Sequence, residues 1–491
     1  MGALPGLIFF LSVLPALPGP PNVVLLMGDD HGWEEVGYNG HPLLKTPTLD
    51  KMAAEGLRMD RFYSAHPSCS PTRGSVLTGR HPNRYGTFHP GCSLRPEEIS
   101  VASLLKKAGY ATAHFGKWHV GPVKASSPTN PGAMGFDEWL SHDNFFELDP
   151  VLSRNGGEPK RYEGEGSEVI VDEAIRFIDR SVKTEDPFLV VIWFGSPHEP
   201  YQALEEDLAL YEELPDDFPE REVALTSNET GKRVKRPLKE VIRERFAEIT
   251  AMDRAIGKLR DHLKSEGLHE DTILWYCGDN GIPPSGLVES RFRALKGSIY
   301  EGGTRVPGVI EWPARIKQPQ VSKVNAVTSD MLPTLCELAG VPLPERPLDG
   351  ISLVPMLDGT MKERGKPICF WDFRGAKRDN SEPYIDPELQ KGTTPLVKLM
   401  GGKPTRDFAN SRFSEIRDGD FAGARAILDG RYKLFIGGGR EGEAELYDLV
   451  KDPGERSDLA KGKPELAGKL RAQLTEWQES VLGSLLGEDY P

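Results

Sequence analysis

The clearest indication of the fold is the segment Asn22-Val-Val-Leu-Leu-Met-Gly-Asp-Asp-His31. After the asparagine it runs through five apolar residues, and a short apolar run of this kind is typical of a strand buried on both faces of a parallel sheet. The run stops at Gly28, and two aspartates and a histidine follow at once. In an open α/β sheet, ligands bind beyond the carboxyl ends of the strands. The stretch therefore predicts a central strand with ligand-binding side chains at its end.

Three further apolar runs have the same form, at Ala111–Phe115, Phe188–Phe194 and Thr272–Cys277. Amphipathic helical patterns lie between the runs. The clearest covers Val241–Leu263, where apolar residues recur every three, four or seven positions. Strands that alternate with helices predict an α/β fold, in which a large, mostly parallel central sheet is flanked by helices on both faces.

The pattern changes after about Pro355. A polar stretch, Arg374–Arg412, is followed by short strand-like segments and by a closing helix with its apolar residues on one face. The strand-like segments are 424–428, 432–436 and 445–449. We therefore expect a catalytic domain over residues 21–360 and a smaller C-terminal subdomain over 361–491, built from an antiparallel sheet and a packed helix.

The length and the net charge of the chain limit the classes of function that it can have. The chain has 491 residues, of which 38% are hydrophobic and 27% charged, so it is long enough and apolar enough for a packed core. Its net charge of −14 argues against nucleic acid as a partner, since nucleic-acid binders usually present a basic face. An anionic substrate would need a local group of basic side chains or a metal ion to overcome this acidic background.

An apolar segment lies near the start of the chain, over residues 5–19. It has about the length of a signal-peptide core and is too short to span a bilayer comfortably. We therefore predict a signal peptide over residues 1–20 and an exported protein, periplasmic or secreted, or lysosomal if the source is eukaryotic. No later segment has the pattern of a transmembrane helix, so no membrane partner is expected.

Five cysteines are too few for a disulfide scaffold, and no Cys-x-x-Cys pair indicates a zinc site. Because the number is odd, at least one cysteine has no partner for a disulfide within the chain, and its thiol is available to react. The cysteines are Cys69, Cys92, Cys277, Cys336 and Cys369.

Polar side chains follow all four predicted strands. Asp and Asn next to glycine also shape turns and cap helices, but two such pairs, each directly after an apolar strand, favour a metal site. Carboxylate and amide oxygens are hard ligands, which suit calcium or magnesium better than zinc. In an extended segment Lys117 and His119 would lie on the same side and contact one anion together. The polar groups at the strand ends are Asp29 with Asp30, Lys117 with His119, His198, and Asp279 with Asn280.

Cys69 lies in the segment Pro67-Ser-Cys-Ser-Pro-Thr-Arg-Gly-Ser-Val-Leu-Thr-Gly-Arg80. Proline is favoured in the first turn of a helix, so Pro71 predicts a helix that begins near Cys69. A helix N-terminus attracts anions, and Arg73 follows one turn later. An unmodified Cys69 would be expected here either as a nucleophilic thiol of low pKa or as a small buried residue.

The run Cys69-x-Pro71-x-Arg73, followed by Leu77-Thr78-Gly79, resembles the signature of the formylglycine-dependent sulfatases, relatives of alkaline phosphatase. The segment Gly109–His119 is similar to the second signature of that family, except that Phe115 stands where a smaller residue is usual. The resemblance extends from Pro21 to about Asp358 and is to sulfatases of the arylsulfatase and N-acetylgalactosamine-6-sulfatase type. It implies an alkaline-phosphatase-like fold and hydrolysis of sulfate monoesters.

The resemblance also implies the chemistry. In that family a maturation enzyme oxidises the cysteine that Cys69 matches to formylglycine. One hydroxyl of the hydrated aldehyde attacks the sulfur of the ester, and the second drives collapse back to the aldehyde with release of sulfate. One Ca²⁺ ion is implied, and its ligands fall on Asp29, Asp30, residue 69, Asp279 and Asn280.

The anion-binding and proton-transfer residues of the family fall on Arg73, Lys117, His119, His198 and Lys296. Lys296 is indicated by the resemblance alone. We interpret His198, with Lys296, as the candidate acid for the leaving oxygen and His119 as the candidate base, and the sequence allows these two roles to be exchanged.

Two alternatives stay open. The first is a phosphonate or phosphate ester hydrolase of the same superfamily, and the second is an inactive binding protein for sulfated glycans, if Cys69 is never oxidised. The resemblance suggests a sulfated carbohydrate as substrate. We expect specificity to depend on Trp33 and on the segments 87–93, 143–162 and 371–412.

Overall fold

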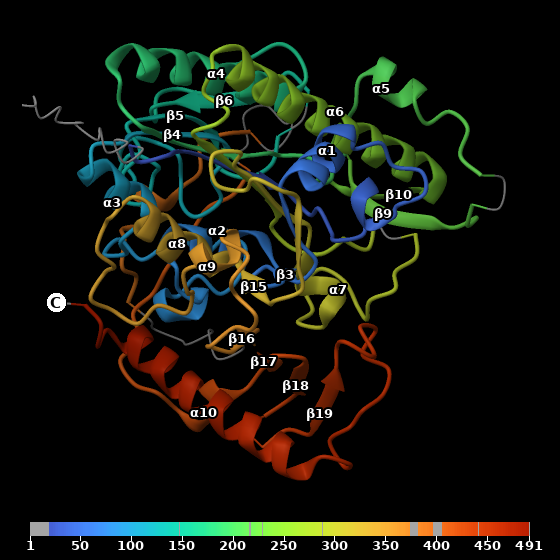
Figure 1. Ribbon diagram of the computed structural model, residues 1–491, viewed down its shortest axis with the longest axis vertical. Helices are drawn as coiled ribbons and strands as arrows, with labels where there is room; N and C mark the ends of the chain where they lie inside the picture. The colour runs from blue at the N-terminus through green and yellow to red at the C-terminus, as the bar shows by residue number, and fades with distance from the viewer. Residues whose placement is uncertain are drawn as a thin grey trace, which may run out of the picture.

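The computed structural model describes residues 19–490 except 147, 216–217, 228, 287, 374–381, 396–404 and 440. Its centre is a ten-stranded sheet with the order β14-β2-β13-β11-β1-β8-β4-β5-β6-β7 (Figure 1). In that order the strands are Gln320–Ser322, Leu57–Met59, Gly308–Glu311, Thr272–Gly278, Asn22–Gly28, Phe188–Trp193, Ala111–Lys117, Glu138–His142, Val151–Arg154 and Lys160–Arg161.

The four strands predicted from apolar runs are β1, β4, β8 and β11, and they lie side by side in the middle of the sheet. Together with β5 they run parallel, while most of the outer pairs are antiparallel. The prediction of a large, mostly parallel central sheet is confirmed. All four carboxyl ends consequently lie at one edge of the sheet.

Helices cover both faces of this sheet (Figure 1). Alternate residues of β1 show why: Val24 and Leu26 pack into one hydrophobic cluster, and Val23 and Leu25 pack into another on the opposite face. The first cluster includes residues of α1 (Pro47–Glu55), α4 (Gly166–Thr184) and α6 (Leu238–Ser265). The second includes residues of α2 (Cys69–Thr78), α3 (Val101–Lys107), α8 (Met331–Leu338) and α9 (Val354–Leu357).

Smaller elements complete the main body. A hairpin of β9 (Glu222–Thr226) and β10 (Arg233–Pro237) projects from it (Figure 1). A three-stranded sheet joins β3 (Phe62–Tyr63), β12 (Arg305–Val306) and β15 (Ala326–Val327). The short helices are α5 (Glu205–Ala209) and α7 (Glu301–Thr304).

The C-terminal part contains a four-stranded antiparallel sheet, β16 (Ile368–Trp371), β17 (Arg425–Asp429), β18 (Tyr432–Ile436) and β19 (Ala444–Asp448). The helix α10 (Pro464–Leu486) packs on one face of it. The predicted antiparallel sheet and packed helix are confirmed. The sequence analysis missed β16, because this strand pairs with β17 across more than fifty residues of mostly polar chain.

A buried charged cluster joins the small sheet to the main body. The ammonium group of Lys433, on β18, lies 3.0 Å from a carboxylate oxygen of Glu301 and 3.1 Å from one of Glu455. Tyr63, on β3, donates a hydrogen bond of 3.0 Å to the other Glu301 oxygen. The Lys433, Glu301 and Glu455 side chains are fully buried. Because buried charges are costly unless paired, this cluster fixes the position of β18 relative to α7.

Within the described residues, no helix combines the length and the hydrophobicity that a membrane crossing requires. The predicted signal peptide, residues 1–20, lies outside the described residues except for its last two positions.

Candidate active site

The carboxyl ends of the four central strands bring the predicted polar residues to one edge of the sheet. Asp29 and Asp30 follow β1, and Asp279 and Asn280 follow β11. The backbone N–H of Asp30 donates a 2.8 Å hydrogen bond to Asp279, and the Asn280 amide donates a 2.9 Å hydrogen bond to the Asp30 carboxylate. All four side chains are buried. The two acidic pairs therefore form one compact group.

Cys69 is the first residue of α2, as the position of Pro71 predicted. Its sulfur lies 3.7 Å from Oδ1 of Asp30. Burial raises the pKa of the Cys69 thiol well above its ordinary value, and the nearby Asp279 adds to this effect. The expectation of an unmodified thiol of low pKa is therefore wrong, because the desolvated thiol keeps its proton.

Arg73 points from α2 into the acidic group. Its Nη2 donates a 2.9 Å hydrogen bond to Asp279 and lies 3.4 Å from Asp29, while Nη1 donates to the Lys117 carbonyl at 3.1 Å. The guanidinium also lies over the Trp193 ring, 5.1 Å from its centroid. These contacts hold a permanent positive charge in a fully buried position beside Cys69.

Two lysines pair with the two aspartates that follow β1. Lys117 Nζ lies 2.5 Å from Asp29 Oδ2, and Lys296 Nζ lies 2.7 Å from Asp30 Oδ2. Burial raises the pKa of Asp29, but Lys117 and the other cations outweigh it and leave that pKa well below its usual range. Burial lowers the pKa of Lys296, but Asp30 outweighs it and leaves that pKa well above its usual range. The site thus holds ionised carboxylates and cations within contact of each other.

The acidic group fits a hard cation. Asp29 Oδ1 and Asn280 Oδ1 are buried and accept no hydrogen bond from the described residues. Ligand atoms of Asp29, Asp30, Cys69 and His198 all lie within 4.8 Å of one another. Burial, and then the negative charge of the neighbouring Asp29, raise the pKa of Asp279 to about 7. A divalent cation with a preference for oxygen would satisfy the unpaired oxygens and neutralise this charge.

His119 lies two residues beyond the end of β4. Its φ of 58° shows that the chain is not extended at this residue, so the assumption of an extended segment is wrong there, while joint contact of Lys117 and His119 with one anion stays a prediction. Both ring nitrogens are buried without a hydrogen-bond partner among the described residues, and Phe408 packs edge-on against the ring at 6.2 Å. Burial, with Lys117 and Arg406, lowers the pKa of His119 far below its usual range, so the imidazole is neutral.

His198 lies at the mouth of the site. Its Nδ1 donates a hydrogen bond to the Glu199 carbonyl, its Nε2 lies 3.8 Å from Asp30, and Phe145 stacks on its ring at 4.8 Å. The side chains of His198 and Lys296 are 15% and 22% exposed, whereas the other candidate residues are almost fully buried. A ligand therefore reaches the buried group past His198 and Lys296.

Arg245, on α6, connects two loops of the site and was not predicted from the sequence. Its guanidinium makes a two-pronged contact with Glu35 at 2.6 and 2.7 Å and donates to the carbonyls of Asp30 and Pro197 at 2.6 and 2.5 Å. It thus joins the loop after β1 to the loop that carries His198. A signal was present, because Arg245 falls on the apolar face of the predicted helix, where a charge must be paired.

We expect Arg245→Met to destabilise the protein by about 3–5 kcal/mol, because it removes the guanidinium that pairs with the buried Glu35 carboxylate and leaves it the backbone N–H of Gly32 as a donor. The matched control is Arg243→Met on the same helix, whose partly exposed side chain donates to the Leu208 carbonyl, and it should change stability by less than ~1 kcal/mol. Denaturant unfolding of the two variants tests this. Equal stability of both would show that the Arg245 contacts do not hold the loops.

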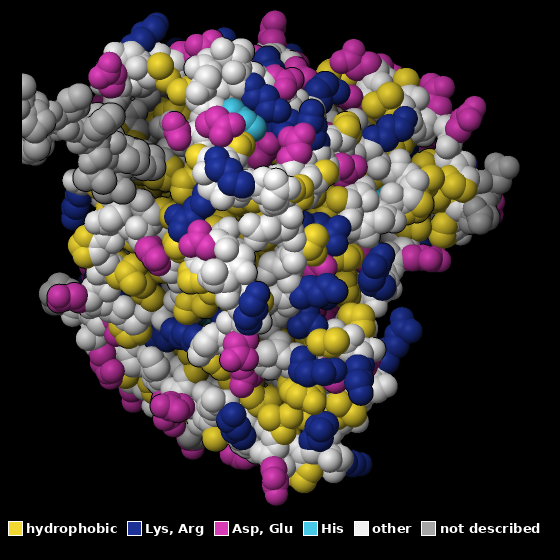
Figure 2. Space-filling view, in the orientation of Figure 1, with side chains coloured by type: hydrophobic (Ala, Val, Ile, Leu, Met, Phe, Trp, Pro, Cys, Tyr) yellow, Lys and Arg dark blue, Asp and Glu magenta, His cyan; other side chains and the backbone are white. Residues whose placement is uncertain are grey.

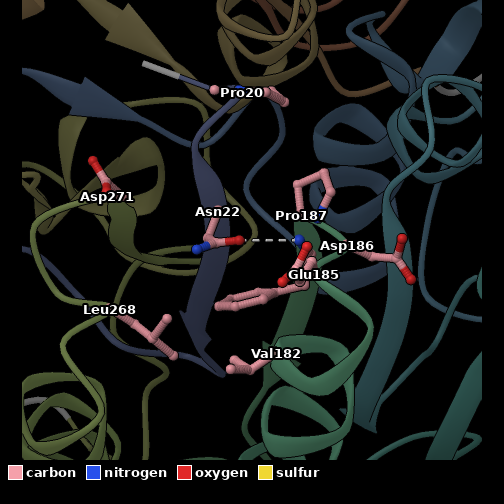
Figure 3. Close-up of a pocket in the computed structure, with 10 residues that line it drawn as sticks. Pro20, Asn22, Val182, Glu185, Asp186, Pro187, Leu268 and Asp271 are labelled. Atoms are coloured by element: carbon pink, nitrogen blue, oxygen red, sulfur yellow. Dashed lines mark hydrogen bonds between the residues drawn. The ribbon is translucent and has the colours of Figure 1, made fainter. Parts of the chain in front are cut away.

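A separate pocket of about 330 Å³ lies at the opposite end of β1 (Figure 3). There Asn22 accepts a hydrogen bond of 3.2 Å from the backbone N–H of Phe188, and the carboxylates of Glu185, Asp186 and Asp271 line the opening. The strand rises ~3.3 Å per residue, so this pocket is roughly 23 Å from Asp29. Its acidic lining and its distance make it unsuitable for an anionic ester that reacts at Cys69.

Comparisons with known proteins agree with this geometry. A family model described as Sulfatase matches residues 21–341. The chain is 31% identical to mouse N-acetylgalactosamine-6-sulfatase over 414 residues, which is 74% of this chain and 72% of that protein. It is 32% identical to human arylsulfatase A over 504 residues, with 94% of this chain and 88% of that protein covered.

Solved structures share the fold. A crystal structure titled Ps i-CgsB in complex with k-i-k-neocarrahexaose has a TM-score of 0.73 at 22% identity, with 94% of this chain and 93% of the other covered. Phosphonate monoester hydrolase of Agrobacterium radiobacter has a TM-score of 0.63 at 19% identity, with 95% and 96% covered. The alkaline-phosphatase-like architecture is thereby shown. From the family model and the curated relatives it follows that this chain belongs to the sulfatase family and is a hydrolase of sulfuric esters.

Proposed function

We propose that the protein hydrolyses sulfate monoesters of a carbohydrate, through a formylglycine hydrate at position 69 and with one bound Ca²⁺. The observation that carries the proposal is the position of Cys69, at the N-terminus of α2 and 3.7 Å from Asp30, in a group where three carboxylates meet Arg73 and two lysines. The names of relatives, N-acetylgalactosamine-6-sulfatase and a Formosa agariphila ulvan-active sulfatase (28% identical, with 96% of this chain and 84% of that protein covered), support a carbohydrate substrate.

Calcium would be held by Asp29, Asp30, Asp279 and Asn280, together with an oxygen of the modified residue 69. When bound, it supplies positive charge that makes a hydroxyl at position 69 more acidic and offsets charge on the sulfate oxygens. The buried Oδ1 atoms of Asp29 and Asn280, which accept no hydrogen bond from the described residues, support this ligand set. A hydrate at position 69 would supply one hydroxyl whose oxygen bonds to sulfur as the alcohol oxygen leaves, and a second whose deprotonation would break the bond from carbon to the sulfated oxygen, releasing sulfate and restoring the aldehyde.

The basic side chains would bind the sulfate group. Arg73, Lys117 and Lys296 approach the acidic group from α2, β4 and the loop before α7. Their charges are fixed by buried contacts before a substrate arrives, so little reorganisation is needed as negative charge spreads over the sulfate oxygens. Preorganised charge of this kind is usually the largest single contribution to such a reaction.

The two histidines would have different roles because their surroundings differ. His198 lies at the mouth, where the alcohol must leave, and its Nδ1 hydrogen bond to the Glu199 carbonyl turns Nε2 toward the site. We assign it, with Lys296, the donation of a proton to the leaving oxygen; because Nδ1 keeps its proton for the Glu199 carbonyl, Nε2 can donate only from the imidazolium, which is protonated on both nitrogens. His119 is buried, neutral and without a hydrogen-bond partner among the described residues, which suits the base that helps the covalent intermediate collapse.

Maturation and location follow from the same proposal. A separate enzyme would oxidise Cys69 to formylglycine, and the segment 1–20 would direct export to the periplasm, to the exterior or, in a eukaryote, to the lysosome. Residues 21–360 would form the catalytic domain, and residues 361–491 the smaller subdomain. Peptide mass spectrometry around residue 69 tests the modification directly. An unmodified cysteine in the mature protein would favour an inactive glycan-binding protein instead.

The fold is shared with a phosphonate monoester hydrolase, so hydrolysis of phosphonate esters is the competing activity to test. We expect 4-nitrophenyl sulfate to be hydrolysed at least about 100-fold faster, in kcat/KM, than the matched 4-nitrophenyl phenylphosphonate, because a phenyl group in the phosphonate, which is also a monoanion, replaces one of the three oxygens that Arg73, Lys117 and Lys296 would contact. Initial rates with both esters on one enzyme preparation test this. A phosphonate preference of similar size would replace the sulfatase proposal with its competitor.

A further inference from the structure

A pocket with a basic lining lies beside the mouth of the candidate site. It has a volume of about 430 Å³ and is lined by Arg291, Phe292, Arg293 and the segment Gly454–Arg456. Figure 2 shows Lys and Arg side chains gathered on this face, over the region of α7 and β19. The chain as a whole has a net charge of −14, so a local concentration of arginine stands out. Clustered positive charge of this kind favours the binding of an anionic ligand.

The chain connects this pocket directly to the site. Arg293 precedes Lys296 by three residues, so their Cα atoms are at most ~11 Å apart. Arg291 donates from both its backbone N–H and its Nε to Glu34, at 3.0 and 3.1 Å, and Glu34 follows Asp30 by four residues. Phe292 packs edge-on against Trp33 at 5.4 Å. The pocket therefore adjoins the same two loops that carry Lys296 and Asp30, on the side where the site opens.

The three arginines are held in different ways. Arg293 is fixed, because it contacts Glu445 at 2.9 Å and Tyr447 at 2.7 Å and stacks on the Tyr300 ring at 3.8 Å. Arg291 is 54% exposed and has Glu34 as its only carboxylate partner among the described residues. The Arg456 side chain is exposed and makes no hydrogen bond or ion pair with any described residue. Arg456 is thus the charge that is available to a ligand.

Two features keep the pocket open and positive. A Cβ atom on Gly454 would lie 3.0 Å from both the Arg291 carbonyl oxygen and Arg456 Nε, so glycine at this position lets the Arg456 side chain lie close to Arg291. Glu455, the one acidic residue of the lining, turns its carboxylate inward to Lys433 at 3.1 Å and to the backbone N–H of Glu301 at 2.7 Å. Its negative charge is therefore paired with Lys433 inside the protein and does not offset the positive charge of the pocket.

We propose that this pocket is an accessory subsite that binds a second anionic group of the substrate, with Arg456 and Arg291 as the contacting residues. The inference rests on the proposed sulfatase function and adds to it a substrate class, an oligosaccharide with at least two anionic groups on neighbouring sugars. A guanidinium binds sulfate and carboxylate alike, so the second group is either of these. Arg293 and Phe292 form the fixed wall against which the ligand packs.

The test compares three synthetic disaccharides and 4-nitrophenyl sulfate. All three disaccharides carry the sulfate to be cleaved, and on the second sugar they carry a sulfate, a carboxylate or a hydroxyl. For the wild-type enzyme we expect a KM about tenfold lower for an anionic second group than for the hydroxyl, because a charge-assisted hydrogen bond has this strength. The ratio between the sulfate and carboxylate forms identifies which anion the subsite prefers.

The variant Arg456→Gln should remove most of this tenfold advantage, and Arg456→Glu should reverse it. Neither change is expected to alter kcat/KM for 4-nitrophenyl sulfate by more than about twofold, since this small ester does not reach the pocket. The matched control is Arg176→Gln on α4, a similarly exposed arginine that pairs with Glu173, and it should affect no substrate.

Two results would refute the subsite without refuting the sulfatase activity on which it rests, and a third would refute both. If the wild-type enzyme turns over 4-nitrophenyl sulfate but has equal KM values for the three disaccharides, the subsite is refuted and the sulfatase proposal stands. If Arg456→Gln lowers kcat/KM equally for all four substrates, the residue acts on the fold or the chemistry and the subsite is again refuted. Failure of the wild-type enzyme to cleave any of the four sulfate esters overturns the sulfatase proposal itself and the subsite with it.

Discussion

Cys69→Ala should abolish turnover of sulfate esters, with a fall in kcat of roughly 10⁴-fold or more, because it removes the atom from which the nucleophile is built. The fold should survive, since alanine fits the buried first position of α2 without clash and, among the described residues, the thiol makes one hydrogen bond, at 3.7 Å. Steady-state rates with 4-nitrophenyl sulfate, together with a thermal unfolding curve, measure both expectations.

Cys69→Ser makes the test more specific. A serine hydroxyl can attack the sulfur once, but it lacks the second hydroxyl that releases sulfate, so the variant should accumulate a covalently sulfated residue 69 that mass spectrometry detects. Cys336→Ala, at a buried position on α8, is the matched control and should retain activity. Full activity in the Cys69→Ala variant would end the nucleophile assignment.

Removal of the divalent cation is the second change with a large expected effect. Chelation should lower kcat/KM by at least about 100-fold, because Arg73, Lys117 and Lys296 would then have to offset both the three carboxylates and the sulfate group without the positive charge of the cation. Added Ca²⁺ should restore the rate. Zn²⁺ should not restore it, because the candidate ligands are hard oxygens.

Metal binding also has a readout that does not depend on turnover. A ligand that binds only the folded state stabilises it by about 2.7 kcal/mol at a hundred times its dissociation constant, so Ca²⁺ should raise the midpoint of thermal unfolding of the chelated protein. Asp279→Ala should lose this increase, while Asp137→Ala, a half-exposed aspartate at the opposite end of β5, should keep it. No Ca²⁺-dependent change in either rate or stability would refute the metal site.

The centre of the fold could be predicted from local sequence because each central strand is buried on both faces. Val24, and Val190 on β8, lie in continuous apolar runs whose length and flanking polar residues identify buried strands without any tertiary information. The same holds for the start of α2, where Pro71 marks the first turn. Residues that immediately follow such elements were accordingly brought together as expected.

Features that depend on distant parts of the chain could not be predicted in this way. The pKa of Cys69 depends on how completely the surrounding loops exclude water, and helix position alone gave the opposite direction. The turn at His119 depends on a positive φ at a residue other than glycine, for which the sequence has no signal. The strand β16 needs β17 as its partner, and the Arg245 contacts need two loops that meet only in the folded chain.

The ion cluster of Lys433, Glu301 and Glu455 has a consequence for how the molecule can be divided. Glu301 belongs to the short helix that follows Lys296, and its only fully buried cationic partner in the described part of the chain comes from the small sheet. A fragment ending near residue 360 would lack Lys433 and Glu455 and would leave the buried Glu301 with Tyr63 and Arg305 as its remaining partners among the described residues. We therefore expect the C-terminal part to act as an obligatory scaffold rather than as a removable module, so that gene truncation at this boundary yields insoluble protein and not a minimal enzyme.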